Sequence, residues 1–176
     1  MWRPQEAKPE GNPIRRNIGS APVFSPDGSL VVSFSDKFAQ VWQIDYTSKP
    51  VGPVGPEIPR KGLYERVAFS YDSQHLIVAS DKIAQVYEVG TGKPQGQPLN
   101  HKDTIHSLAL YSTGRVAVTG SWREAQLWDV STGKPIGASV PRQIGTSANC
   151  VALSSDGRPL LVCSGKVARI YVVASN

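Results

Sequence analysis

Side chains that could act as nucleophiles, bases or metal ligands are few in this chain and widely spaced. The histidines are His75, His101 and His106, and the cysteines are Cys150 and Cys163. A catalytic nucleophile needs a base beside it, and a metal site needs several ligands at short spacing, such as a Cys-x-x-Cys pair. The sequence contains no such cluster, and no Asp/Glu pair stands out at an acid–base spacing. We therefore predict no catalytic residues, no metal site and no cofactor.

One glycine-rich segment has the residue types of a phosphate-binding loop. Gly90-Thr91-Gly92-Lys93 lacks the Gly-x-x-x-x-Gly-Lys-Ser/Thr spacing, however, and Pro94 follows where a helix should begin. A related segment recurs at Thr132-Gly133-Lys134-Pro135. We interpret both segments as turns between strands.

The composition is that of a folded protein with many turns. Of 176 residues, 40% are hydrophobic and 19% are charged, and Gly (16) and Pro (14) are frequent. This composition disfavours disorder and long helices. The formal net charge of +5 is small for a protein that follows phosphate backbones, so nucleic acid is not an expected partner. No membrane-spanning run or secretory signal is visible, and the two cysteines are expected to be buried free thiols, which favours a cytoplasmic location.

A four-fold internal repeat dominates the chain. Four segments share an apolar residue, a serine-containing turn and a following alternating strand, and each ends at an aromatic residue after the same interval. That interval is 15 positions in every unit, from Asp27 to Trp42, Asp72 to Tyr87, Thr113 to Trp128 and Asp156 to Tyr171. A constant interval indicates one hairpin built four times, whereas the variable, Gly- and Pro-rich segments after each aromatic residue are predicted to be connections.

Four strands can be placed within one unit. Apolar and β-branched residues alternate between turn signals, as half-buried antiparallel strands require. In the second unit, the predicted strands are 67–70, 76–79, 83–89 and a weak fourth strand at 94–99. The fourth strand carries Pro and Gly and is therefore expected at a sheet edge.

These features resemble the WD-repeat β-propeller family. The unit length of 41–45 residues, the four strands and the aromatic residue that closes the third strand all match, and Trp128-Asp129 is the signature dipeptide. Trp42-Gln43, Tyr87-Glu88 and Tyr171-Val172 are degenerate forms of it, and Asn100-His101 stands where the family usually has Gly-His. The resemblance implies an all-β fold with four blades' worth of four-stranded antiparallel sheets.

The resemblance also implies structural roles. The closing aromatic residues are Trp42, Tyr87, Trp128 and Tyr171. In the family, a loop His, a strand Ser or Thr, the closing Trp and a turn Asp form a hydrogen-bond network. Here the matching residues are His101, Thr119 and Trp128, while Trp122 replaces the turn Asp, so we expect the network to be incomplete. Asp36 and Asp81 are predicted to tie down their own turns by accepting backbone N–H bonds.

The two ends of the chain suggest how a ring could close. The interval from Trp2 to Lys8-Pro9 repeats that from Trp128 to Lys134-Pro135, so residues 1–14 read as the end of a blade, with an orphan outer strand at 8–14. The last unit stops after its third strand. We therefore treat residues 1–176 as a single propeller domain or half-domain. Three interpretations remain open: two copies that pair as an eight-bladed ring, part of a longer propeller, or a tight four-bladed ring.

Basic residues gather in loops that a propeller would place on one face. Loops entering the first strands hold Arg15, Arg60, Lys61, His101 and Lys102, and turns between the second and third strands hold Lys37, Lys82, Arg123 and Lys166. Trp122 lies in such a turn beside Arg123, a composition typical of binding hot spots. We predict that this face binds a partner. The alternatives are a solvated rim for the charges and packing over a neighbouring loop for Trp122.

The sequence therefore favours a non-catalytic protein–protein interaction scaffold with no membrane association, whose rigid blades present loops to a protein of unknown identity. The alternative is a structural self-assembly unit, a half-propeller that forms a homodimer through its edge blades and N-terminal strand. An enzyme would need a polar cluster around the central channel.

Overall fold

Four antiparallel β-sheets follow one another along the chain. The computed structural model describes residues 22–35, 37–44, 52–59, 65–111, 113–141, 149–154 and 159–172. The first sheet contains β1 (Val23–Phe24), β2 (Leu30–Phe34), β3 (Phe38–Gln43) and β4 (Gly52–Pro59). The second contains β5 (Glu65–Phe69), β6 (His75–Ser80), β7 (Ile83–Glu88) and β8 (Pro94–Asn100).

The third and fourth sheets repeat this arrangement. The third contains β9 (Ser107–Leu110), β10 (Val116–Gly120), β11 (Glu124–Asp129) and β12 (Lys134–Pro141), and the fourth contains β13 (Asn149–Leu153), β14 (Pro159–Ser164) and β15 (Val167–Val172). In every sheet the spatial order of the strands equals their order in the chain. None of the described residues forms a helix, so no helix there could span a membrane.

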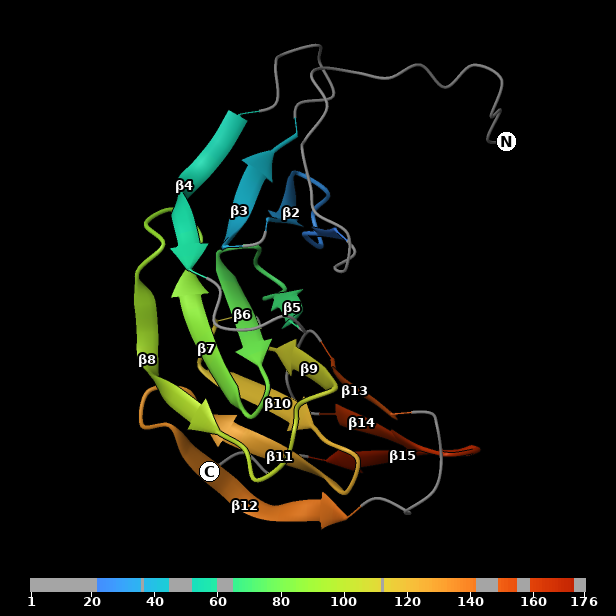
Figure 1. The fold of residues 1–176 in the computed structure, drawn as a ribbon. Coiled ribbons are helices and arrows are strands. Elements are labelled where there is room, and N and C mark those ends of the chain that lie inside the picture. The colour runs from blue at the N-terminus through green and yellow to red at the C-terminus, as the bar shows by residue number, and fades with distance from the viewer. Residues whose placement is uncertain are drawn as a thin grey trace, which may run out of the picture.

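The sheets are arranged around an open arc, with β4, β8 and β12 on its outer edge (Figure 1). First strands of neighbouring sheets contact each other, β5 against β9 and β9 against β13. This radial arrangement of four-stranded meanders is that of propeller blades, and the predicted all-β fold class is confirmed. The predicted orphan strand at residues 8–14 lies outside the described residues.

The strands predicted for the second unit agree with β5 to β8 to within two residues at each end. The difference is largest at β5, which begins at Glu65 and ends at Phe69, before Ser70. Ser70 belongs to the turn because its hydroxyl accepts a hydrogen bond from the backbone N–H of His75 at 2.9 Å and donates to Asp72. The related turn in the first sheet holds Asp27, whose pKa is lowered from 3.8 to about 2 by hydrogen bonds from the hydroxyl of Ser25 and from the backbone N–H and hydroxyl of Ser29.

Apolar side chains fill each interface between sheets. The buried cluster between the first and second sheets contains Val32, Val41, Phe69 and Leu76. The cluster between the second and third contains Ile77, Val86, Leu99 and Trp128, and that between the third and fourth contains Val118, Val151, Leu160 and Val162. Because both faces of an inner sheet are covered by neighbours, β6 is buried along Leu76, Ile77, Val78 and Ala79 in succession.

A glutamine stabilises a register shift in each complete sheet. The pairing of the third and fourth strands shifts after Ala39, Ala84 and Ala125, at equivalent places in the three units. The next residue is a glutamine in each case. The side-chain amide of this glutamine hydrogen-bonds to both strands at the register shift. The amide nitrogen of Gln85, for example, donates to the carbonyl oxygens of Val86 in β7 and Gln95 in β8, both at 3.0 Å. The sequence analysis did not identify these glutamines, although their recurrence two positions before the closing aromatic residue is a detectable signal.

A glycine on the outer strand of each of the first two sheets lies directly against the next sheet. Gly96 in β8 has φ +64°, and a Cβ atom there would lie 1.9 Å from the carbonyl oxygen of Val130. The adjacent backbone N–H of Gln97 donates to that same oxygen at 3.0 Å. Gly55 in β4 has φ +66°, and a Cβ atom there would lie 2.5 Å from the carbonyl oxygen of Val89. Only glycine permits both the backbone conformation and this approach.

The cysteines differ from the expectation of buried free thiols. Cys150 and Cys163 are directly paired across β13 and β14, with a Cα–Cα distance of 5.0 Å, and they form a disulfide. Cys150 is exposed rather than buried. Direct pairing across two strands brings the sulfur atoms within bonding distance.

The glycine contact between sheets gives a first prediction. Gly96→Ala should lower the free energy of unfolding by about 2–4 kcal/mol, because it combines a positive φ with a clash against backbone. Gly137→Ala is the matched control. Gly137 occupies the equivalent position in β12 with φ +64°, and a Cβ atom there would meet no described atom within 4 Å. It should cost only about 1 kcal/mol. Equal losses in urea denaturation would contradict this account of the interface.

Candidate functional site

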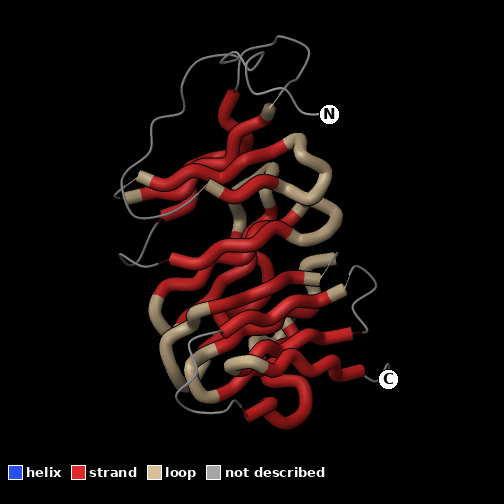
Figure 2. Tube along the Cα trace, turned by 90° about the vertical axis from the view of Figure 1, so that its right-hand side faces the viewer, coloured by secondary structure: helices blue, strands red, loops and turns tan. Residues whose placement is uncertain are grey.

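One end of the strands carries the turns that the sequence analysis assigned to a binding face. We call it the top face and define it as the four turns β2–β3, β6–β7, β10–β11 and β14–β15 together with the loop between β8 and β9. In Figure 2 the sheets lie above one another and their turns gather at the two ends of the strands. Backbone hydrogen bonds connect the parts of this face: the N–H of His101 donates to the carbonyl of Lys82 at 2.8 Å, and that of Ile105 donates to the carbonyl of Asp81 at 2.7 Å.

Four cations occupy equivalent turn positions on the top face. They are Lys37, Lys82, Arg123 and Lys166, one from each sheet, and all four are exposed. Arg123 lies 3.4 Å from a carboxylate oxygen of Asp103 in the β8–β9 loop. Among the described residues, no carboxylate lies within ion-pair distance of Lys37, Lys82 or Lys166, so these three charges are available to a partner.

Trp122 lies in the β10–β11 turn of the top face and is 53% exposed. Its ring meets that of His106 edge to face, with the ring centroids 4.6 Å apart. His106 is itself held by its backbone, since its N–H donates to the carbonyl of Gly120 at 2.8 Å and its carbonyl accepts from Nε of Arg66 at 3.0 Å. The exposed indole therefore packs against a histidine whose backbone is held by residues from the second and third sheets.

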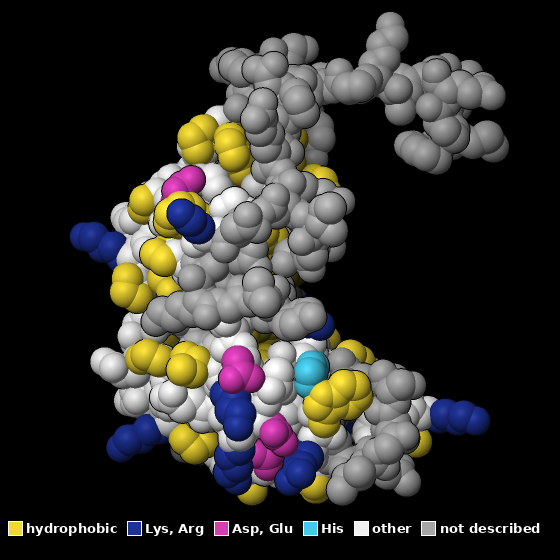
Figure 3. All heavy atoms as spheres, viewed as in Figure 1, with side chains coloured by type: hydrophobic (Ala, Val, Ile, Leu, Met, Phe, Trp, Pro, Cys, Tyr) yellow, Lys and Arg dark blue, Asp and Glu magenta, His cyan; other side chains and the backbone are white. Residues whose placement is uncertain are grey.

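Charged side chains surround this aromatic pair. Lys102 lies 3.8 Å from one carboxylate oxygen of Glu124, and the hydroxyl of Ser139 donates to the other at 2.6 Å. The lower half of Figure 3 shows Lys/Arg and Asp/Glu side chains beside a histidine and hydrophobic side chains. Lys102 and Arg123 are thus partly neutralised, whereas Lys82 on the neighbouring sheet is not.

The structural network around Trp128 is present in part. The indole N–H of Trp128 donates to the hydroxyl of Thr119 at 2.7 Å, and both residues are buried. The rings of His101 and Trp128 lie 6.1 Å apart, and Nδ1 of His101 accepts the backbone N–H of Asp103 at 3.2 Å. We had included His101 among the partner-binding residues, but its packing against Trp128 leaves it only 5% exposed, and it cannot form part of that surface.

A similar bond in the first sheet was missed by the sequence analysis. The indole N–H of Trp42 donates to the hydroxyl of Ser33 at 2.8 Å. Ser33 precedes Trp42 by nine positions, as Thr119 precedes Trp128, so the interval is the signal that could have identified it. In the second sheet the corresponding pair is Val78 and Tyr87, which cannot form this bond because valine has no acceptor.

Asp81 differs from its predicted role. We expected its carboxylate to accept backbone N–H bonds within its own turn. Instead, it accepts the hydroxyl of Thr104 at 2.8 Å and ties the β6–β7 turn to the β8–β9 loop. Tyr171 packs against the buried cluster of the last sheet interface, as a closing residue should. The predicted residues Arg15, Asp36, Arg60 and Lys61 lie outside the described residues.

The inner ends of the sheets line a small, open apolar pocket. About 220 Å³ is bounded by first strands of the second, third and fourth sheets, including Ala68, Phe69, Leu110 and Val151. Tyr71 and Ser154 supply the polar side chains among the described lining residues.

Comparison with known proteins agrees with the repeated sheets. The family profile "WD domain, G-beta repeat" matches residues 17–43 and 92–129. The chain is 35% identical over 66 residues to the guanine nucleotide-binding protein subunit beta of Schizosaccharomyces pombe, a match that covers 38% of this chain and 22% of that relative. The match therefore spans less than a quarter of the relative's length. Together with the four sheets and their shared closing residues, these matches support a WD-repeat architecture for the chain.

Proposed function

We propose that this chain is a non-catalytic scaffold whose top face binds a partner protein. The observation that carries the proposal is Trp122, a large aromatic side chain that is half-exposed yet held edge to face against His106. Tryptophan and arginine are enriched among residues that dominate binding energy. A side chain already held in one orientation loses less conformational entropy when a partner covers it.

The charges on the top face favour an acidic partner segment. Lys37, Lys82 and Lys166 stand at equivalent turns with no described carboxylate within ion-pair distance, while Arg66 lies next to the Trp122–His106 pair. Complementary charge increases association rates and suppresses wrong partners. Asp103 and Glu124 lie among the cations, so the surface is mixed rather than uniformly basic, which supports protein over nucleic acid as the partner.

The name of the relative is consistent with this proposal. That protein is called a subunit, which describes a member of a larger protein assembly. The WD repeats of this chain support a protein-interaction role of the same general kind, and a cytoplasmic location remains part of the proposal.

The proposal predicts that Trp122→Ala weakens partner binding without unfolding the protein. Loss of a central aromatic side chain should cost about 2 kcal/mol or more of binding free energy, roughly a thirtyfold loss of affinity. Tyr71→Ala is the matched control, because Tyr71 is 62% exposed in the β5–β6 turn at the opposite end of the strands. Proteins retained by the immobilised chain from its native extract would be quantified by mass spectrometry, with thermal unfolding as the test of folding. The proposal fails when both variants retain the same proteins at the same levels.

Self-assembly is a second candidate, favoured by one observation. The last strand, β15, exposes apolar side chains, with Ile170 70% and Val172 80% exposed, and within the described residues nothing pairs with its outer edge. An exposed apolar strand edge is a template for pairing with another chain. In this alternative, two copies cover each other's edge strands and form a homodimer.

Light scattering on a sizing column, across a range of protein concentrations, tests this alternative. A homodimer predicts twice the monomer mass for the wild-type chain and a concentration-dependent return to the monomer mass for Ile170→Lys, because a charge on the edge strand opposes pairing. A monomer mass for the wild-type chain at all concentrations would rule out the homodimer and leave the top-face proposal intact.

A further inference from the structure

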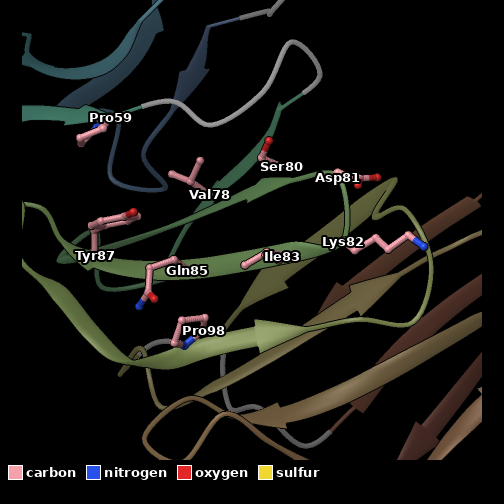
Figure 4. A pocket seen from close by; sticks show the side chains of 9 residues that line it. All are labelled: Pro59, Val78, Ser80, Asp81, Lys82, Ile83, Gln85, Tyr87 and Pro98. Carbon is pink, nitrogen blue, oxygen red and sulfur yellow. The ribbon is translucent and has the colours of Figure 1, made fainter.

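A cavity of about 390 Å³ lies between the first and second sheets, beside the β6–β7 turn of the top face. Figure 4 shows the side chains that line it, from β4 on one side and from β6, β7 and β8 on the other. Its apolar lining consists of Pro59, Val78, Ile83, Tyr87 and Pro98. Cavities of this size with mainly apolar walls are typical of sites that receive a ligand.

The repeat explains why the cavity exists. Residues 41 positions further along the chain occupy the same places in the third sheet, and there the side chains are polar. Val78 corresponds to Thr119, Tyr87 to Trp128, Ile83 to Glu124 and Pro98 to Ser139. In the third sheet, Trp128 donates to Thr119, and Ser139 donates to Glu124. The buried His101 packs beside Trp128, so that interface is occupied by a polar network.

In the second sheet Val78 and Ile83 replace the two acceptors, Thr119 and Glu124, so neither bond can form. Hydrogen-bonded polar side chains fill this position in the third sheet, whereas mainly apolar side chains line a cavity at the same position in the second sheet. An apolar surface left uncovered is costly in water, and Ile83 at the rim is 46% exposed. The cavity is therefore a site that gains free energy when an apolar group covers it.

Two of the polar side chains that line the cavity, those of Gln85 and Asp81, are already hydrogen-bonded, which limits the chemistry of the occupant. The amide nitrogen of Gln85 donates to two backbone carbonyl oxygens, and the carboxylate of Asp81 accepts the hydroxyl of Thr104. A polar small molecule would find few directional partners at these groups. Lys82 adds an exposed positive charge at the rim. The lining thus suits an aliphatic or aromatic side chain with an acidic neighbour.

We infer that the cavity receives an apolar side chain of the partner segment that binds the top face, with an acidic residue of that segment beside Lys82. This inference rests on the proposed function and names the anchor residue of its partner. The cavity is continuous with the top face, because Asp81 and Lys82 of the β6–β7 turn line it. The Asp81–Thr104 hydrogen bond joins this rim to the β8–β9 loop that also carries His106. The Trp122–His106 pair and the cavity are thus two contact points for one extended segment.

Two capped dipeptides test this inference, acetyl-Leu-Glu-amide and acetyl-Ala-Glu-amide. Methyl and indole signals of the isotopically labelled chain would be followed by NMR during titration with each. The leucine probe should produce saturable shifts of the Val78 and Ile83 methyl signals. The alanine probe should bind about tenfold or more weakly, because it buries three fewer carbons. Equal affinities, or no saturable methyl shifts with either probe, would overturn the inference.

Two variants provide the controls. Ile83→Glu introduces the residue type of the third sheet at the rim and should abolish the methyl shifts of Val78. Ile136→Glu changes a comparably exposed isoleucine on β12, away from the cavity, and should leave the leucine-probe affinity unchanged. A probe response confined to the indole N–H of Trp122 would overturn the cavity inference and leave the proposed function standing. An unchanged partner set for Trp122→Ala would instead refute the proposed function, whatever the probes show at the cavity.

Discussion

The contact between an outer-strand glycine and the next sheet is the constraint on which the other features depend. At Gly55 and Gly96 the backbone approaches the carbonyl oxygens of Val89 and Val130 so closely that a Cβ atom would lie 2.5 Å and 1.9 Å away. Because the glycine recurs at the same strand position, the first and second sheets each meet the next sheet in the same way. The apolar clusters between the sheets then fill a space whose dimensions this contact has already set.

Repetition of that contact explains why one face can act as a binding surface. The repeated contact places equivalent turns of the first three sheets at equivalent positions, so Lys37, Lys82 and Arg123 form a regular series along the arc, and Lys166 holds the same turn position in the fourth sheet. Differences in function then arise from single side chains on a repeated frame. Trp122 replaces the aspartate of the second unit, and the polar network of the third sheet becomes an apolar cavity in the second. The repeated sheets hold the turns in place, and these local substitutions determine what the surface can bind.

The repeat made much of the fold accessible from sequence, because the constant interval from Asp27 to Trp42 reports a hairpin of fixed length. Strand limits and turn positions follow from such local intervals, whereas the Thr119–Trp128 pair was implied by the family resemblance. The cavity does not, because it depends on how two sheets face each other, and Val78 and Tyr87 read as ordinary apolar strand residues. The burial of His101 and the Asp81–Thr104 bond were missed for the same reason: both depend on contacts that the β8–β9 loop makes after the sheets have assembled.

Site-specific photo-crosslinking is the most direct test of the central claim that the top face is the binding surface. A photoreactive amino acid would replace Lys82 on the top face or, in a separate variant, Tyr71 at the opposite end of the strands; both positions are exposed. After irradiation in the protein's native extract, the account predicts discrete adducts of higher mass from position 82 and none from position 71. Adducts from position 71 alone, or equal yields from both positions, would contradict it.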